Sequence, residues 1–260
     1  MTEFLTKTIN AMNIPFIIRL AFNKTDDKSE DIMINTYEKM NAFLEKIDLE
    51  YSPFRDDSLV SRFQRGDKQP LLNSEAFKSV YSKSVVVGEL TNGSFEVYFN
   101  GDPTKLIKSW AIEQSFNRFM VPLFENENVI GISLEGRGNA KFAVRPSTNF
   151  EWEIKTVLKT YKMRYGSIST SKINSRTKYL EKDQMDAIQE LAVVGNSLVD
   201  TDIWANVGIT AGTMKFTNII RNFYLSGMLI DNQESVIFTE GILGRHQNKK
   251  GLNLDNIKEK

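Results

Sequence analysis

The order of strand-like and helix-like segments restricts the fold of this chain more than any other feature of its sequence. The segment from Pro15 to Phe22 is rich in β-branched and aromatic residues between polar flanks, which predicts a β-strand. From Lys28 to Tyr51 the apolar residues recur at the spacing of a helix. This spacing predicts an amphipathic helix that buries a stripe made of Met33, Tyr37, Met40, Leu44 and Ile47.

Helix-like and strand-like segments are interspersed over the rest of the 260 residues. This pattern predicts an α+β or mixed α/β fold, as a single domain or two packed lobes over residues 1–243, followed by a polar tail, 244–260. Residues 52–67 and 137–149 are expected to be loops because they are polar and contain glycine or proline. The other expected elements are helices over 74–90, 102–119 and 201–227, with Ser74 and Asp102 as N-caps, and strands over 128–136, 150–157, 166–172 and 189–195.

Composition excludes several classes of site. The chain has 33 basic and 33 acidic residues, so no net basic field points to nucleic acid or to an anionic membrane. It has no cysteine and one histidine, His246, which argues against thiolate and multi-histidine zinc sites. A metal site would therefore use oxygen ligands, which Mg²⁺ and Ca²⁺ prefer. No signal peptide, lipobox or transmembrane segment is recognisable, so a cytoplasmic protein is expected.

Two aspartates stand near the start of an otherwise apolar, small-residue stretch, Ser197 to Gly212. Acidic residues at a helix N-terminus complement the helix dipole by about 0.3–1 kcal/mol each, which requires no function. A metal or phosphate site would also explain Asp200 and Asp202. The residues alone leave both interpretations open.

Taken in order, the polar stretches of the chain resemble the motifs of the ApbE-like family, the FAD:protein FMN transferases. The segment "AMNIPFII" is similar to the family's Ala-Met-Gly-Thr-Pro segment and keeps Met12 and Pro15. "YSPFRDDSLVSRFQRGD" resembles its serine-rich loop, and "TNGSFEV" resembles its Thr-Asp-Gly-Ala-Phe-Asp motif, with Glu96 for the last aspartate. "DPTKLIKSWAIE" is similar to its Asp-Leu-Gly-Gly-Ile-Ala-Lys-Gly-Tyr-Ala helix and keeps Asp102 and Lys108.

Two later segments complete the resemblance, which covers roughly residues 12–212. "SISTSK" resembles the family's Ala-Thr-Ser-Gly stretch through Thr170 and Ser171. "TDIWANVGITAG" resembles its Ala-Asp-Ala-Leu-Ala-Thr segment, with Asp202 on the aspartate and Asn206 on the threonine. Each motif is weak alone, and their shared order and spacing make the resemblance specific.

The chain also departs from the family pattern. The family's His-Ile-Ile-Asp-Pro-Arg-Thr-Gly segment has no counterpart, since "INSRTKYLEKDQMDAIQ" stands in its place without a histidine. Arg137 falls where the aspartate of a Gly-Gly-Asp motif is expected. Several glycines of the family are replaced, by Thr104, Lys105, Ser109 and Lys172.

The resemblance implies a T-fold-like, ApbE-like architecture of mixed or antiparallel sheets with packed helices. It also implies Mg²⁺-dependent transfer of FMN from FAD to a threonine or serine hydroxyl of a partner flavoprotein, with release of AMP. Asp202 and Lys108 would then be catalytic, and Asp202 and Asn206, one helical turn apart, would hold the metal, leaving Asp200 as the helix cap. The residues expected at FAD are Met12, Glu96, Asp102, Lys108, Thr170 and Ser171.

Other functions remain open beside this one. The departures favour a flavin-binding or scaffold protein that keeps the fold and has lost transfer. An FAD pyrophosphatase would use water in place of the acceptor hydroxyl. Phe95 and Trp110 could contact a flavin ring, although core packing also explains them, and Arg55 and Arg62 could contact a pyrophosphate.

Overall fold

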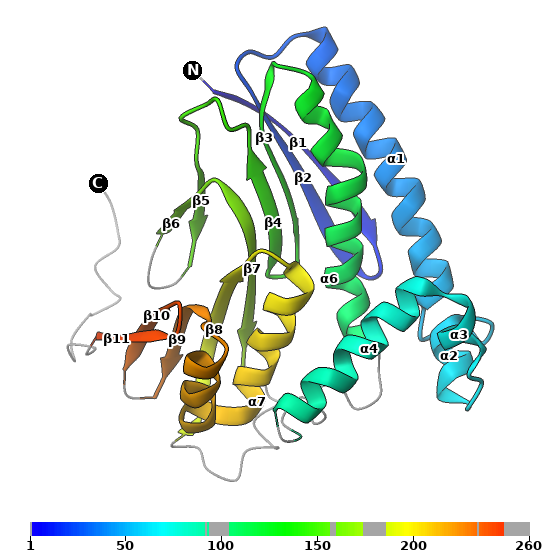
Figure 1. Cartoon of the computed structure of the whole chain (residues 1–260). Helices are drawn as coiled ribbons and strands as arrows, with labels where there is room; N and C mark the ends of the chain where they lie inside the picture. Colours follow the sequence, from blue (N-terminus) through cyan, green and yellow to red (C-terminus); the bar gives the residue numbers. More distant parts are fainter. Residues whose placement is uncertain are drawn as a thin grey trace, which may run out of the picture.

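A long antiparallel sheet organises the computed structural model, which describes residues 2–91, 93, 104–156, 160–173, 186–232 and 234–246. The strand order is β1-β2-β3-β4-β7-β8-β9-β10-β11, and every neighbouring pair is antiparallel. Helices lie against one face, and the β5–β6 hairpin lies against the other (Figure 1). The expected α+β architecture is therefore confirmed. The strands are β1 (Glu3–Ala11), β2 (Ile14–Phe22), β3 (Val129–Gly136), β4 (Asn139–Val144), β5 (Trp152–Lys155), β6 (Thr160–Met163), β7 (Tyr165–Lys172), β8 (Ile188–Gly195), β9 (Ser226–Asp231), β10 (Ser235–Thr239) and β11 (Ile242–His246).

The helices form as the apolar spacing predicts. In α1 the side chains of Met33, Met40, Leu44 and Ile47 are buried against the sheet, and Tyr37 is half-buried at the edge of the same cluster. The helix begins with a capping box, in which the Asp26 carboxylate accepts a hydrogen bond from the Ser29 backbone N–H. The helical elements are α1 (Asp27–Tyr51), α2 (Leu59–Gln64), α3 (Gln69–Asn73), α4 (Glu75–Leu90), α6 (Thr104–Ser115), the π-turn η1 (Phe116–Met120), the 3₁₀ turn η2 (Val121–Glu125) and α7 (Leu198–Asn222).

Two segments expected to be loops contain regular structure. Residues 137–149 include β4, in which Ala140, Phe142 and Val144 alternate with more exposed residues and pack beneath the β5–β6 hairpin. Residues 52–67 include α2, which Ser58 caps by accepting a hydrogen bond from the Ser61 N–H at 3.1 Å. In both segments the glycine and proline residues beside the short element led to the prediction of a loop, and that prediction was wrong for the element itself.

The helix expected over 201–227 is α7, and only one of its glycines interrupts it. Gly208 stays helical, and a glycine is needed there because α7 lies close to β8: a Cβ would come within 2.2 Å of the Leu191 side chain. Gly212 breaks the helix with φ 76° and ψ 170°, a conformation that favours glycine. The half of α7 before this break carries Asp202 and Asn206.

Two boundaries of the sequence analysis fall outside the described residues. α6 is described from Thr104, so the expected N-cap Asp102 is not among them, and neither are residues 247–260 of the expected polar tail. Within the described ranges, no helix is long and apolar enough to cross a membrane.

Candidate active site

The residues expected to be functional come from three elements that meet on the helix-covered face of the sheet. Asp202 and Asn206 project from α7, Ser171 lies on β7, and Lys108 lies half-buried on α6. β7 packs against α7, and α6 packs beside α7. Glu96 and Asp102 lie outside the described residues.

Asp202 is a buried carboxylate, with a side chain among neutral polar groups. The residue is 6% exposed. Asn206 donates through Nδ2 to Asp202 Oδ1 at 2.9 Å, and the Ser169 hydroxyl lies 3.2 Å from the same oxygen. Burial raises the pKa of Asp202 from its ordinary value of 3.8 to about 6, against the opposing effect of its hydrogen-bonding neighbours Ser109, Ser169, Asn139 and Asn206.

The Ser169 hydroxyl has one proton and two acceptors within reach. Its oxygen is 2.7 Å from Asn139 Oδ1 and 3.2 Å from Asp202 Oδ1. A hydroxyl donates one hydrogen bond at a time. The hydroxyl can therefore donate either to Asn139 or to the Asp202 carboxylate. The side chains around Asp202 offer oxygen atoms, the ligand type that Mg²⁺ prefers.

Asn206 contacts Asp202, but through its amide nitrogen. The same nitrogen also donates to the Asp202 carbonyl at 2.7 Å, and Asn206 Oδ1 accepts from the Ser171 hydroxyl at 3.0 Å. In this orientation Asn206 supports the carboxylate as a donor and directs its amide oxygen toward β7. The described residues hold no group of three or more His, Asp or Glu side chains that could bind a metal.

Strand alternation separates two residues that the sequence analysis paired. Ser169 and Ser171 of β7 face α7, whereas Thr170 points to the other face, where its hydroxyl donates to the Gly138 carbonyl at 2.8 Å. Thr170 lines a pocket of about 560 Å³ there, together with Arg19 and residues of the β5–β6 hairpin. The period of two along β7 would have indicated Ser169 as the partner of Ser171.

Asn139 is the second residue that sequence reasoning missed. Arg137, which was set against the family's aspartate, lies in the β3–β4 turn with a positive φ of 47°. Asn139, two residues later, is the side chain of this segment that reaches Ser169 and Asp202. The tight turn of Arg137 and Gly138 brings the start of β4 to this position.

Asp200 is not the helix cap that the sequence analysis expected. Ser197 is the N-cap of α7, and its hydroxyl accepts a hydrogen bond from the Asp200 N–H at 3.3 Å. Asp200 is the third residue of the helix, so its own side chain points outward, where it forms an ion pair with Lys83 at 2.5 Å. Its acidic position in the first turn still complements the helix dipole.

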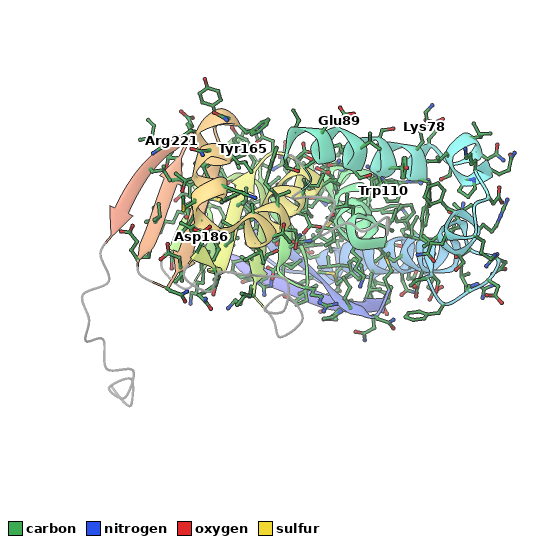
Figure 2. All side chains as sticks on the ribbon, turned by 90° about the horizontal axis from the view of Figure 1, so that it is seen from below. Lys78, Glu89, Trp110, Tyr165, Asp186 and Arg221 are labelled. Carbon is green, nitrogen blue, oxygen red and sulfur yellow. The ribbon has the colours of Figure 1, made fainter. Side chains whose placement is uncertain are left out.

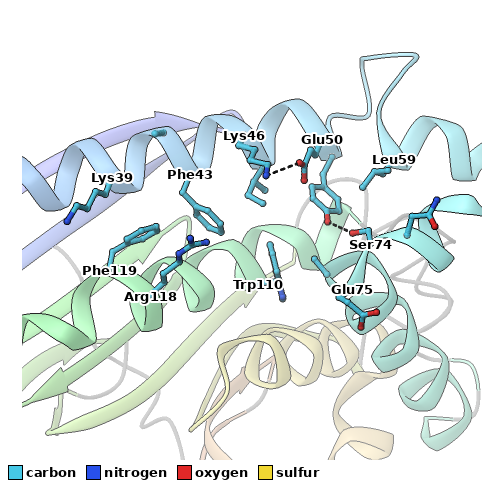
Figure 3. Close-up of a pocket in the computed structure, with 15 residues that line it drawn as sticks. Lys39, Phe43, Lys46, Glu50, Leu59, Ser74, Glu75, Trp110, Arg118 and Phe119 are labelled. Carbon is cyan, nitrogen blue, oxygen red and sulfur yellow. Dashed lines mark hydrogen bonds and ion pairs between the residues drawn. The ribbon is translucent and has the colours of Figure 1, made fainter.

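Met12 and Trp110 lie in different surroundings from Asp202. Met12 occupies the β1–β2 turn with φ 52°, its side chain is buried, and its N–H donates to Asp48 Oδ2 at 3.2 Å. Trp110 packs against Tyr51 with ring centroids 6.3 Å apart. It faces a groove of about 760 Å³ between α1, α6 and the start of α4 (Figure 3). Phe95 lies outside the described residues.

The two arginines expected near a pyrophosphate have acidic partners close in sequence. Arg55 pairs with Asp57 at 3.0 Å, and Arg62 pairs with Asp67 at 2.7 Å. These pairs stabilise the turns around α2 and account for both guanidinium groups without a ligand.

Comparisons with known proteins agree on the fold. No family model and no curated protein matches the sequence. Among solved structures, the chain is similar to the flavin transferase ApbE from Vibrio cholerae, with a TM-score of 0.63 and 11% identity over 96% of this chain and 98% of that one. It is also similar to the Pseudomonas stutzeri flavinyl transferase ApbE, with a TM-score of 0.66 and 13% identity over 96% of each chain. The Thermotoga maritima ApbE protein gives a TM-score of 0.63 at 12% identity, over 94% of this chain and 97% of that one. The chain therefore has the fold of the ApbE flavin transferases.

Proposed function

We propose that this protein transfers FMN from FAD to a threonine or serine hydroxyl of a partner flavoprotein and releases AMP. The observation that carries the proposal is the buried Asp202 carboxylate, which lies among hydroxyl and amide groups in the fold of known flavin transferases. Burial of an ionisable group costs folding free energy. Such a perturbed acid in a polar cluster is typical of functional sites.

In the proposed reaction the acceptor's hydroxyl oxygen attacks the phosphorus on the FMN side of FAD. A phosphoester bond forms, the bond from that phosphorus to the bridging oxygen breaks, and AMP leaves with that oxygen. The hydroxyl proton passes to a base, for which Asp202 is suited because a pKa of about 6 leaves it ionised at neutral pH. Lys108 would stabilise negative charge on the phosphate oxygens.

The donor chemistry of the cluster fits Mg²⁺. We assign the metal to Asp202, with the oxygens of Ser169 and Asn139 as neighbours, and Asn206 would join by presenting its amide oxygen instead of its nitrogen. When bound, Mg²⁺ supplies positive charge to the pyrophosphate oxygens.

We place FAD against the segments that surround this cluster. Ser171 faces α7 beside Asn206 and so lies next to the cluster. Thr170 lines the opposite face of the sheet, away from the cluster. The assignments of Met12, Glu96, Asp102 and Lys108 as FAD-binding residues rest on their motifs.

One contact favours a second candidate, a flavin-binding or scaffold protein without transfer activity. Asn206 donates to the Asp202 carboxylate with the nitrogen of its amide, so the group at this position stabilises the acid without a metal. The same site would act as an FAD pyrophosphatase if water replaced the acceptor hydroxyl.

The product distinguishes the three functions. The protein is incubated with FAD and Mg²⁺, with and without a flavoprotein fragment that offers a threonine for flavinylation, and AMP and the fragment's mass are measured. A transferase releases AMP only with the fragment and adds one FMN to it. AMP with free FMN identifies a hydrolase, and bound flavin without either product identifies the scaffold function and rejects the proposal.

A further inference from the structure

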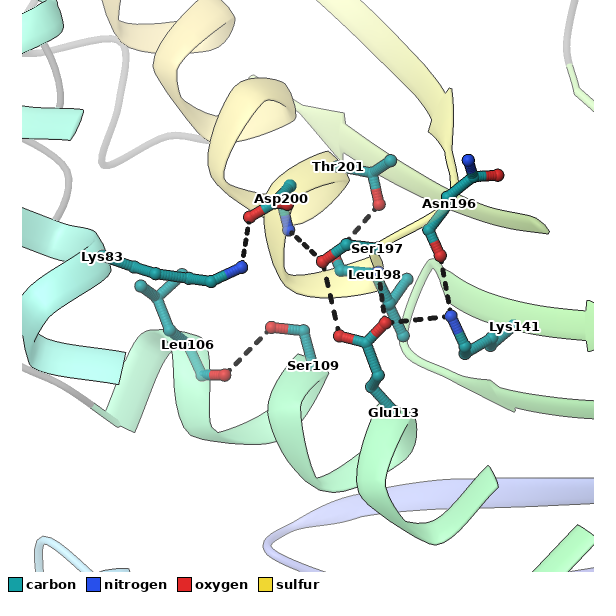
Figure 4. A network of polar contacts seen from close by, with 10 residues as sticks. All are labelled: Lys83, Leu106, Ser109, Glu113, Lys141, Asn196, Ser197, Leu198, Asp200 and Thr201. Carbon is teal, nitrogen blue, oxygen red and sulfur yellow. Dashed lines mark hydrogen bonds and ion pairs between the residues drawn. The ribbon is translucent and has the colours of Figure 1, made fainter. Parts of the chain in front are cut away.

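A partly buried ion pair ties α6 and β4 to the first turn of α7 (Figure 4). Glu113 of α6 accepts a hydrogen bond from the Leu198 N–H at 3.1 Å through Oε1, and Ser197 Oγ lies 3.4 Å from its Oε2. The Leu198 N–H is one of the N–H groups that a helix start leaves without an intrahelical partner. Glu113 is therefore a second cap of α7, supplied by another helix.

Lys141 of β4 holds Glu113 in this position. Its ammonium group is 2.9 Å from Glu113 Oε1 and donates to the Asn196 carbonyl at 2.7 Å. The two side chains are only 12% and 15% exposed. Asn196 immediately precedes the N-cap Ser197, so the pair contacts the chain on both sides of the helix start.

The same face of α6 reaches Asp202 one helical turn away. Ser109 lies four residues before Glu113, and Asp202 lies four residues after Leu198, so the two helices run antiparallel and make two polar contacts one turn apart. The outer contact joins Glu113 to Leu198. At the inner contact Ser109, whose hydroxyl donates to the Leu106 carbonyl at 2.9 Å, lies beside the Asp202 carboxylate. A displacement of the first turn of α7 would move Asp202 with it.

We propose that Glu113, beside Lys141, is the positioning residue that fixes where α7 starts and so places Asp202 against Ser109 and Ser169, acting through its acceptor oxygen and not through its charge. The effect on catalysis rests on the proposed function, whereas the effect on Asp202 does not. A buried ion pair adds little net stability compared with well-packed apolar residues. Its value here is placement, because its acceptor atoms satisfy the start of the helix that carries Asp202.

Two double variants separate the contact from the charges. The first, Glu113→Leu with Lys141→Met (the Leu/Met variant), removes the pair without leaving a buried charge, so the protein should fold. The second, Glu113→Gln with Lys141→Met (the Gln/Met variant), also removes both charges but keeps an oxygen for the Leu198 N–H. Lys83→Met is the matched control, because Lys83 pairs with Asp200 in the same turn of α7 but at the surface, where the side chains are 40% and 52% exposed.

The rate of FMN transfer is measured at several concentrations of FAD, which gives kcat and KM separately. For the Leu/Met variant kcat should fall by about tenfold or more while KM for FAD stays within about threefold, since misplacement affects the reacting groups. The Gln/Met variant and Lys83→Met should keep kcat within about threefold of wild type. A Leu/Met variant with wild-type kcat, or an equal loss in the Gln/Met variant, overturns the proposal.

A stability measurement decides the positioning role even if the protein transfers no FMN. Asp202→Asn is combined with the Leu/Met variant, and urea unfolding is followed at about pH 8, where Asp202 is ionised. If Glu113 holds Asp202 in its buried position, the effect of Asp202→Asn should be smaller in the Leu/Met background than in wild type. Strictly additive effects of Asp202→Asn and the Leu/Met substitutions on the free energy of unfolding overturn the proposal. Absence of FMN transfer by the wild-type protein overturns only the proposed function.

Discussion

At the scale of single residues, Asp202 shows what the sequence could and could not indicate. Its position on a motif predicts that it is the functional acid, which stays a prediction, but the sequence could not show which polar side chains surround it. Ser169 and Asn139 come from β7 and β4, far apart in sequence from α7, and only the pairing of those strands brings them together. Ser169 was within reach of a prediction, because strand alternation places it beside Ser171.

The assignment of Asp200 shows the opposite error. An acidic residue near a helix start was expected to be its cap, but the cap must precede the first helical turn, and Ser197 occupies that position. The helix was expected to begin at residue 201, but α7 begins at Leu198. This difference of three residues places Asp200 inside the first turn and makes Ser197 the N-cap.

Asp202 should destabilise the protein when it is ionised. Because burial raises the pKa of Asp202 in the folded state, the protonated side chain contributes stability below about pH 4. This contribution is lost as the pH rises through about 6. The shift of about two units corresponds to about 3 kcal/mol. Without metal, Asp202→Asn should therefore raise the free energy of unfolding at pH 8 and change it little at pH 4, as measured by urea unfolding at both pH values.

Asp200→Asn is the matched control for this prediction. Asp200 lies in the same helix, but its side chain is 52% exposed, so its replacement should change stability by no more than about 0.5 kcal/mol at either pH. A loss of stability in Asp202→Asn at pH 8 would show that the carboxylate is not held ionised in a buried site.

At the scale of elements, periodic apolar spacing predicted the long helices well. The buried stripe of α1 matched because its contacts repeat every turn along one face. β4 was missed because it is only six residues long and its flanks contain turn residues. For α7, sequence could not distinguish Gly208, which permits close packing, from Gly212, which breaks the helix, since only the position of β8 does so.

The stripe of α1 gives a direct test of the core. Leu44 is fully buried, so Leu44→Ala should lower the free energy of unfolding by about 2–5 kcal/mol. Leu49 lies on the same helix but is 57% exposed, and Leu49→Ala should change it by less than about 0.5 kcal/mol. Chemical denaturation of the two variants makes the comparison, and equal losses would contradict the orientation of α1.

At the scale of the whole molecule, the candidate site lies between two hydrophobic clusters that α7 connects. Leu198 and Ile203 belong to the cluster under α1 and α6, and Ala205 and Ile209 belong to the cluster under the second half of the sheet. Figure 2 shows Trp110 and Glu89 on the side of the molecule where the helices lie. The polar cluster around Asp202 therefore has packed apolar side chains on both sides.

Binding of Mg²⁺ at Asp202 should stabilise the folded protein as a whole. A metal at ten times its dissociation constant adds about 1.4 kcal/mol to the free energy of unfolding. Thermal unfolding of the wild type at pH 8 should therefore shift upward with Mg²⁺, and that of Asp202→Asn should not. An equal shift in both proteins would place the metal elsewhere.

The account depends most on Asp202 as the acid that supports FMN transfer. The most direct measurement is the rate at which an acceptor fragment gains FMN from FAD and Mg²⁺, compared among wild type, Asp202→Asn and Asp200→Asn at equal folded concentration. We predict that Asp202→Asn, although more stable than wild type at pH 8, loses transfer by about two orders of magnitude or more, whereas Asp200→Asn retains it. Transfer at the wild-type rate by Asp202→Asn would contradict the account.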